Sequence, residues 1–213
     1  MRNIDKAKLL VPSDFVPVKK HQTISKELMF KKDYHILAMG LYENTDISPE
    51  YYAETKGYIV LEGKLKIGGE LIYKNQGIFF PERQLFQIQA LEDSIFLEIS
   101  YCEKEENMEN IEKGKVINLK DSLDYVKGAI TNLDIVSKKD LKIMILAFDE
   151  GEGLKPHSAP GDALLLALEG TAKVGVGENE FMIEAGKQIV FPKDITHSVE
   201  AKTKFKMLLI LSI

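Results

Sequence analysis

The sequence predicts an all-β protein made of two copies of one domain in tandem. Three observations support this prediction: an internal repeat, many short apolar runs, and glycine, proline and asparagine residues that separate these runs. Short strands with regular turns are typical of a β-sandwich or barrel. We therefore expect the 213 residues to form two small barrels, each long enough to bury its own core.

The repeat becomes visible when the chain is shifted by 107 positions. Identity between the copies is low, but the order and spacing of glycine, proline and apolar residues persist, which chance rarely produces. Two short insertions in the second copy change the offset after its middle. The matched positions are Lys31-Lys32-Asp33 with Lys138-Lys139-Asp140, Leu61-Glu62-Gly63 with Leu168-Glu169-Gly170, Gly77 with Gly186, and Phe80-Pro81 with Phe191-Pro192.

Strand signals recur in the second copy. A turn at Gly175–Asn179 is predicted to join two short strands as a hairpin, and Gly68-Gly69 is its tighter counterpart in the first copy. The expected strands are 143–148, 163–168, 172–174, 181–183, 189–191 and 205–213.

The segment between the copies predicts a linker. Residues 103–113 are acidic with little apolar content, so we expect a solvated stretch. A short linker helix is predicted after Asn118, with Leu119, Leu123 and Val126 on one face and Gly128 at its end. The predicted domains are therefore 1–102, a linker with a helix at 103–137, and 138–213.

Composition excludes several classes of function. The net charge is −5 and no cluster of Lys and Arg dominates, so nucleic-acid binding is not expected. The first residues lack the apolar core of a signal peptide, and no apolar run is long enough for a membrane helix. Cys102 is the only cysteine, which suits a reducing compartment. We expect a cytoplasmic protein.

Two groups of residues in the second copy carry a recognisable spacing. Gly151, His157 and Gly170 form the first group, and Gly186, Pro192 and His197 form the second. In this spacing the chain resembles the cupin superfamily, whose motifs are G-x5-H-x-H with a later E-x6-G, and G-x5-P-x-G-x2-H. Because the resemblance extends over both copies, it implies a bicupin of two jelly-roll barrels. The second copy is also similar to small bacterial single-domain cupins.

The second copy departs from the ligand set of metal-binding cupins. The resemblance implies that imidazoles and one carboxylate converge inside the barrel, where Zn, Ni, Fe or Mn could bind. His157 holds the first ligand position and His197 the last, but Ala159 stands where a second histidine belongs and Ala163 where the glutamate belongs.

Asp162 is a conditional third ligand. Strand alternation would turn it away from the site, since it precedes the glutamate position by one residue. The preceding Pro160-Gly161 could shift the register through a bulge. The alternative is a turn carboxylate that accepts backbone N–H groups. Two histidines alone would need water or an added carboxylate to complete a metal site.

The first copy has lost the ligand positions. Glu50 stands at the position of His157, Tyr52 at that of Ala159, Thr55 at that of Asp162, and Phe86 at that of His197. We expect this barrel to hold no metal and to fill its mouth with aromatic side chains.

Three functional classes follow from these residues. The favoured one is a small-molecule-binding protein that uses a pocket lined by His157, His197 and Asp162, with or without a metal. The second is a metal-dependent isomerase, lyase or dioxygenase acting on a sugar acid or keto acid. The third is a structural protein without a ligand. The missing ligands favour the first class over the second, and the retained histidines argue against the third.

The runs 143–148 and 163–168 are apolar on both strand faces, so their outer faces need a cover. We expect the two barrels to pair within the chain, or a homodimer to provide the cover. Proteolytic cleavage of the linker near Glu105 should then leave the halves associated in size-exclusion chromatography. Halves that separate as folded monomers would contradict this expectation.

Overall fold

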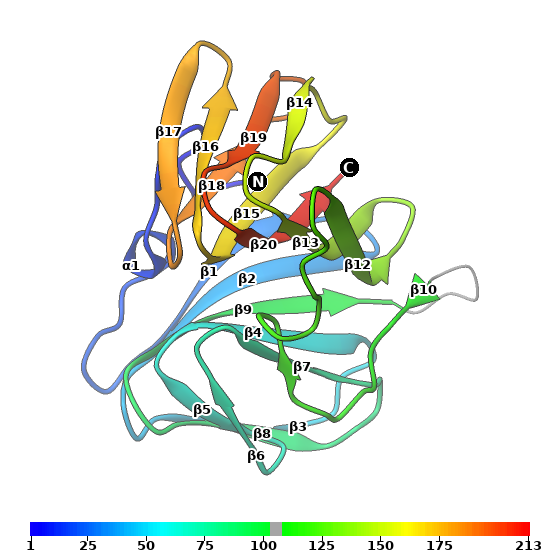
Figure 1. Cartoon of the computed structure of the whole chain (residues 1–213). Helices are drawn as coiled ribbons and strands as arrows, with labels where there is room; N and C mark the ends of the chain where they lie inside the picture. The colour runs from blue at the N-terminus through cyan, green and yellow to red at the C-terminus, as the bar shows by residue number, and fades with distance from the viewer. Residues whose placement is uncertain (103–107) are drawn as a thin grey trace. The chain divides into compact units, whose positions relative to one another are not determined.

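The computed structural model describes residues 1–102 and 108–213, and their regular secondary structure is almost entirely strand (Figure 1). The described residues contain one helix, α1 (Pro12–Phe15), which is a single turn. No helix in the described part of the chain has the length and hydropathy that a bilayer span requires. The chain divides into two compact units, which confirms the predicted all-β fold of tandem domains.

The first unit consists of two antiparallel sheets. The larger sheet has the order β1-β2-β9-β4-β7-β11 and the smaller one the order β3-β8-β5-β6. The strands are β1 (Thr23–Phe30), β2 (Tyr34–Leu41), β3 (Asp46–Glu50), β4 (Thr55–Glu62), β5 (Lys64–Ile67), β6 (Glu70–Tyr73), β7 (Gln76–Phe80), β8 (Phe86–Ala90), β9 (Ser94–Tyr101) and β11 (Ile117–Asn118).

The second unit repeats this topology. Its larger sheet has the order β10-β12-β13-β20-β15-β18 and its smaller sheet the order β14-β19-β16-β17. The strands are β10 (Met108–Glu109), β12 (Ile130–Ser137), β13 (Leu141–Phe148), β14 (Gly153–His157), β15 (Asp162–Glu169), β16 (Thr171–Val176), β17 (Asn179–Glu184), β18 (Gln188–Phe191), β19 (His197–Ala201) and β20 (Phe205–Ser212).

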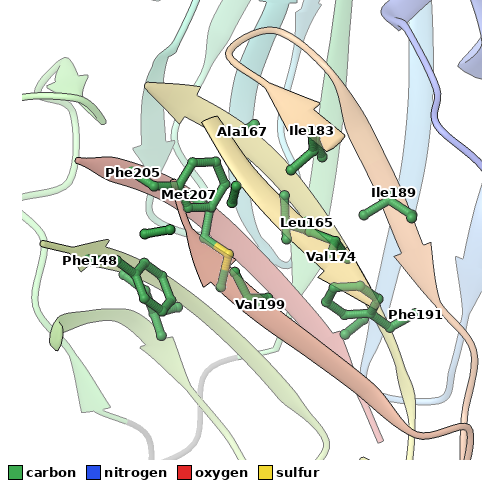
Figure 2. Close-up of a cluster of buried hydrophobic side chains, with 14 of the residues drawn as sticks. Phe148, Leu165, Ala167, Val174, Ile183, Ile189, Phe191, Val199, Phe205 and Met207 are labelled. Carbon is green, nitrogen blue, oxygen red and sulfur yellow. The ribbon is translucent and has the colours of Figure 1, made fainter. Parts of the chain in front are cut away.

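Alternate residues of these strands form the core between the two sheets. Figure 2 shows Leu165 and Ala167 of β15 gathered with Val174, Val199 and Phe205 from other strands of the second unit. These residues are almost fully buried, and they share one side of their strands because successive side chains point to opposite faces.

The predicted linker helix is wrong. Asn118 pairs with Gln76 as part of β11 instead of capping a helix, and residues 119–129 form turns and irregular chain. Leu119 is fully buried while Val126 is 51% exposed, so the apolar residues do not form one face. Tertiary contacts outweigh the local helix preference, since the Lys206 ammonium donates to the Lys120 carbonyl.

Short segments extend both larger sheets beyond their last long strands. In the second unit, the Ala7 amide donates to the Val190 carbonyl at 2.9 Å. In the first unit, the Gly114 amide donates to the Phe79 carbonyl at 2.7 Å, and β11 continues this pairing. We call residues Asp5–Val11 the N-terminal strap. These segments cover edges of β18 and β7 that would otherwise present unpaired backbone groups.

The covering segments belong to the repeat, which therefore extends upstream of Lys31. The Asn3 side-chain amide donates to the Glu27 carbonyl at 2.9 Å, and Asn110 donates to the Asp134 carbonyl at the same distance. Residues 1–8 read MRNIDKAK and residues 108–115 read MENIEKGK. This similarity is visible in the sequence and shows that the repeat includes residues 1–8.

The two units do not follow the predicted division at 1–102, 103–137 and 138–213. The first unit contains Met1–Ile4, residues 12–102 and Ile111–Asn118, and the second contains Asp5–Val11, residues 108–110 and Leu119–Ile213. The difference arises because the strap and β12 are hydrogen-bonded into the sheet of the second unit. Part of the predicted acidic linker, residues 103–107, lies outside the described residues.

The core of the first unit contains a buried ion pair that sequence reasoning missed. The Lys56 ammonium lies 2.8 Å from Glu98 Oε1 and 2.6 Å from Ser100 Oγ, and it lies 4.4 Å from the centre of the Tyr52 ring. The Lys56 and Glu98 side chains are only 9% and 10% exposed. Both share the core-facing side of their strands with Tyr58, so the charges lie between the two sheets.

Breaking this pair should destabilise the first unit strongly. Lys56→Met or Glu98→Gln leaves one buried charge without its partner, which costs about 3 kcal/mol or more, whereas the double variant should cost less than the sum of both. Urea unfolding measures these losses. Lys173→Met is the control, because the Lys173–Glu180 pair is 37% and 66% exposed and should contribute less than about 1 kcal/mol. Equal losses at both pairs would contradict the expectation.

Candidate functional site

The structure brings His157 and His197 together at one end of the second barrel. His157 is the last residue of β14 and His197 the first of β19, and the two are register partners across these neighbouring strands. A register shift between Leu154 and His157 re-aims the end of β14. The centres of the two imidazole rings lie 4.5 Å apart with an angle of 59° between their planes.

Both rings are oriented by backbone carbonyls. His157 Nδ1 lies 2.8 Å from the Lys155 oxygen, and His197 Nδ1 lies 2.9 Å from the Ile195 oxygen. A carbonyl oxygen only accepts hydrogen bonds, so Nδ1 of each neutral ring carries the proton. The lone pair that can accept a proton or bind a metal therefore lies on Nε2 of each ring. Metal-binding histidines in proteins are commonly oriented in this way.

His197 is the buried member of the pair. It is 5% exposed, and its ring stacks on Phe191 with centroids 4.4 Å apart and an interplanar angle of 9°. Burial is the main cause that lowers its pKa below the ordinary value; the hydrogen bond to Ile195 opposes this shift, and His157 adds to it. His157 is exposed. The pair thus has one solvent-exposed imidazole, that of His157, and one buried imidazole, that of His197.

The remainder of this interior is apolar. The core cluster supplies Ala163 and Phe191 beside the histidines, and Leu209 and Leu211 of β20 are partly buried against it. The buried polar residues in the described strands of the second unit are Asp162, Gln188, His197, Lys206 and Ser212. Of these, only His197 lies on the side of its strand that faces the core. A ligand at the histidines would therefore meet an apolar wall.

Asp162 does not join the histidines. Its neighbour Ala163 belongs to the core cluster, so Asp162 lies on the opposite side of β15. One carboxylate oxygen is 2.7 Å from the Lys6 ammonium, and the other accepts the Lys193 amide at 2.9 Å. The Pro160-Gly161 sequence has not shifted the register, because Asp162 pairs with Ser212 and Ala163 with Leu211 in unbroken order.

No group of three or more His, Cys, Asp or Glu side chains among the described residues is placed to hold a metal ion. His157 and His197 thus provide two ligands of the three or four that a resident transition metal usually takes from protein. The residues present do not form a complete metal centre. Water or a bound small molecule would have to supply the missing ligands.

The equivalent place in the first barrel has the same frame with other side chains. Glu50 and Phe86 are register partners, as His157 and His197 are in the second barrel. Phe86 stacks on Phe80 with centroids 4.2 Å apart, as His197 does on Phe191. Two phenylalanine rings therefore stack in the first barrel, where a phenylalanine and an imidazole stack in the second.

Sequence and fold comparisons identify relatives of the chain. The Cupin domain family matches residues 144–213. No curated protein matches the sequence. A cupin 2 conserved barrel domain protein from Leptotrichia buccalis is 28% identical, and the alignment covers 99% of this chain and 98% of that protein with a TM-score of 0.84.

More distant solved structures share the fold. Salicylate 1,2-dioxygenase from Pseudoaminobacter salicylatoxidans is 11% identical with a TM-score of 0.61 over 84% of this chain and 70% of its own length. Oxalate decarboxylase from Bacillus subtilis is 13% identical with a TM-score of 0.55 over 98% and 76%. At these identities the likeness concerns the fold alone. The second barrel thus matches the Cupin domain family over residues 144–213, and the chain shares the fold of two tandem barrels with a cupin 2 conserved barrel domain protein over nearly its whole length.

Proposed function

We propose that the chain is a small-molecule-binding protein whose ligand sits in the second barrel against His157 and His197. The observation that carries the proposal is the shared orientation of the two rings. Each donates its Nδ1 proton to a backbone carbonyl and keeps the Nε2 lone pair. Two neutral imidazoles 4.5 Å apart attract a hydrogen-bond donor or a cation more than an anion.

The surroundings restrict the ligand further. Apolar residues such as Ala163, Phe191 and Leu211 favour a ligand with an apolar body. A hydroxyl group of such a ligand could donate to one Nε2. A small hydroxy acid, sugar acid or keto acid would suit the pair best when a bound divalent metal ion links its oxygen atoms to the imidazoles.

The metal is a conditional part of this proposal. Imidazole nitrogen suits Zn, Ni, Fe and Mn in varying degree, and a metal held by two protein ligands exchanges readily with solution. The missing third ligand is the reason for preferring a binding protein over a metal-dependent isomerase, lyase or dioxygenase.

Removal of either histidine should weaken ligand binding strongly. Calorimetry measures binding when the protein is titrated with Zn²⁺, Ni²⁺, Fe²⁺ or Mn²⁺, each with and without pyruvate or gluconate. We expect His157→Ala and His197→Phe to weaken binding at least about tenfold, which corresponds to the loss of one of two ligands. His197→Phe copies the stacked Phe86 of the first barrel and so preserves the packing.

Glu50→Ala is the matched control, because Glu50 occupies the place of His157 in the first barrel. Its binding should equal that of the parent. Binding that survives both histidine changes and disappears with Glu50→Ala would place the site in the first barrel and overturn the proposal. Metal-free binding of pyruvate or gluconate that depends on the histidines would support the proposal without the metal.

Ligand binding should weaken in acid. Because the pKa of His197 is lowered in the folded protein, its ring stays neutral at neutral pH and is protonated below its ordinary value of about 6.5. Protonation occupies Nε2, so Zn²⁺ affinity measured from about pH 8 to pH 5 should fall with decreasing pH.

The same shift predicts the sign of a stability change. Near the ordinary histidine pKa, His197 binds a proton more readily in the unfolded chain than in the folded chain. The free energy of unfolding should therefore decrease as the pH falls through this range. In urea unfolding, His197→Phe should reduce this slope. An unchanged slope in this variant, or Zn²⁺ binding that tightens in acid, would contradict the assignment of a neutral buried imidazole.

A further inference from the structure

Two loops carry the histidine pair. Residues 158–161 follow His157 and lead into β15, and residues 192–196 follow β18 and lead into His197. The β14–β19 pairing makes the histidines neighbours, and these two loops connect them to β15 and β18.

Asp162 holds them. Its Oδ1 accepts the Lys193 amide of the second loop at 2.9 Å, while the residue itself begins β15 at the end of the first loop. A backbone hydrogen bond of 2.9 Å from the Asp194 amide to the Ala159 carbonyl runs beside it. Asp194 has φ +60°, in the left-handed region.

The carboxylate that makes this link needs a countercharge. Asp162 is 8% exposed, and a buried carboxylate without a cation is costly. The Lys6 ammonium lies 2.7 Å from its Oδ2. The strap carries Lys6 to this place because the next residue, Ala7, is hydrogen-bonded to Val190 of β18.

We propose that Lys6 is a positioning residue of the histidine site: by pairing with Asp162 it fixes the two loops from which His157 and His197 extend. The inference rests on the proposed function to the extent that the histidine pair is the binding site. It assigns the strap a role in that site although the strap contains none of the histidines.

The first barrel supports this assignment by contrast. It keeps the backbone link between its loops, since the Arg83 amide donates to the Tyr52 carbonyl at 2.7 Å, and Arg83 has the same φ of 60°. At the place of Asp162 it has Thr55. The carboxylate and its lysine are thus paired only in the barrel that has the two histidines, among the described residues.

Three variants of the full-length protein test the proposal. Lys6→Met removes the cation and keeps a long side chain. Asp162→Asn keeps an oxygen for the Lys193 amide and removes the charge. Lys8→Met is the matched control from the same strap, because Lys8 pairs with Asp5 at 3.0 Å where both side chains are about two-thirds exposed (67% and 66%).

The first measurements need no ligand. Amide hydrogen exchange at Lys193 and Asp194 and the NMR signal of the His197 Nδ1 proton report the loops and the ring directly. We expect exchange to rise about tenfold or more and the Nδ1 signal to broaden or disappear in Lys6→Met and Asp162→Asn, with Lys8→Met like the parent. Adding Lys6→Met to Asp162→Asn should cause little further change. Circular dichroism must show the β-fold in all variants.

Zn²⁺ affinity is the second measurement. It should fall about tenfold in Lys6→Met and Asp162→Asn and remain unchanged in Lys8→Met. If the parent binds no Zn²⁺, the proposed metal fails, and the exchange and Nδ1 measurements still decide the role of Lys6. Identical exchange and Nδ1 signals in Lys6→Met and Lys8→Met would overturn the inference. So would a tighter Zn²⁺ affinity in Lys6→Met, since Lys6 would then compete with the metal for Asp162.

Discussion

Strand alternation is the constraint on which both barrels depend. Every strand sends alternate side chains into the space between its two sheets, so a few core-facing positions decide what each barrel can hold. Position matters more here than residue type. Asp162 and Ala163 are neighbours, yet only the alanine faces the interior, and the carboxylate is thereby unavailable to the histidines on the other side of β15.

The two barrels share one frame but place different side chains in it. A ring stacked on a phenylalanine occupies the same register position in both, as Phe86 in the first and His197 in the second. Next to it, β4 places Lys56 where β15 places Ala163. The lysine and Glu98 form a buried ion pair in the first interior, whereas the second has the apolar Ala163 at the position of the lysine. The first interior thus contains paired charges, and the second contains apolar residues beside the histidine pair.

Much of this organisation was predictable from the sequence, and the reasons for the failures are physical. The repeat, the strands of the second barrel and the facing positions of His157 and His197 follow from spacing, which register preserves. The linker helix failed because Leu119 and Asn118 take part in tertiary packing and strand pairing that local propensity does not represent. The buried pair of Lys56 and Glu98 could not be found, because its residues are far apart in sequence and charged residues are normally expected outside.

The partner of Asp162 could not be predicted from the sequence either. Its separation from Lys6 by 156 positions leaves no local signal, and only the fold brings the two together. The physical need for this partner nevertheless follows from the burial of the carboxylate. A neutral imidazole can lie in an apolar interior with one hydrogen bond to a carbonyl, as His197 does, but a buried carboxylate needs a cation. The interior-facing side of β15 is thus apolar, while the buried carboxylate on its other side is paired with Lys6 of the strap.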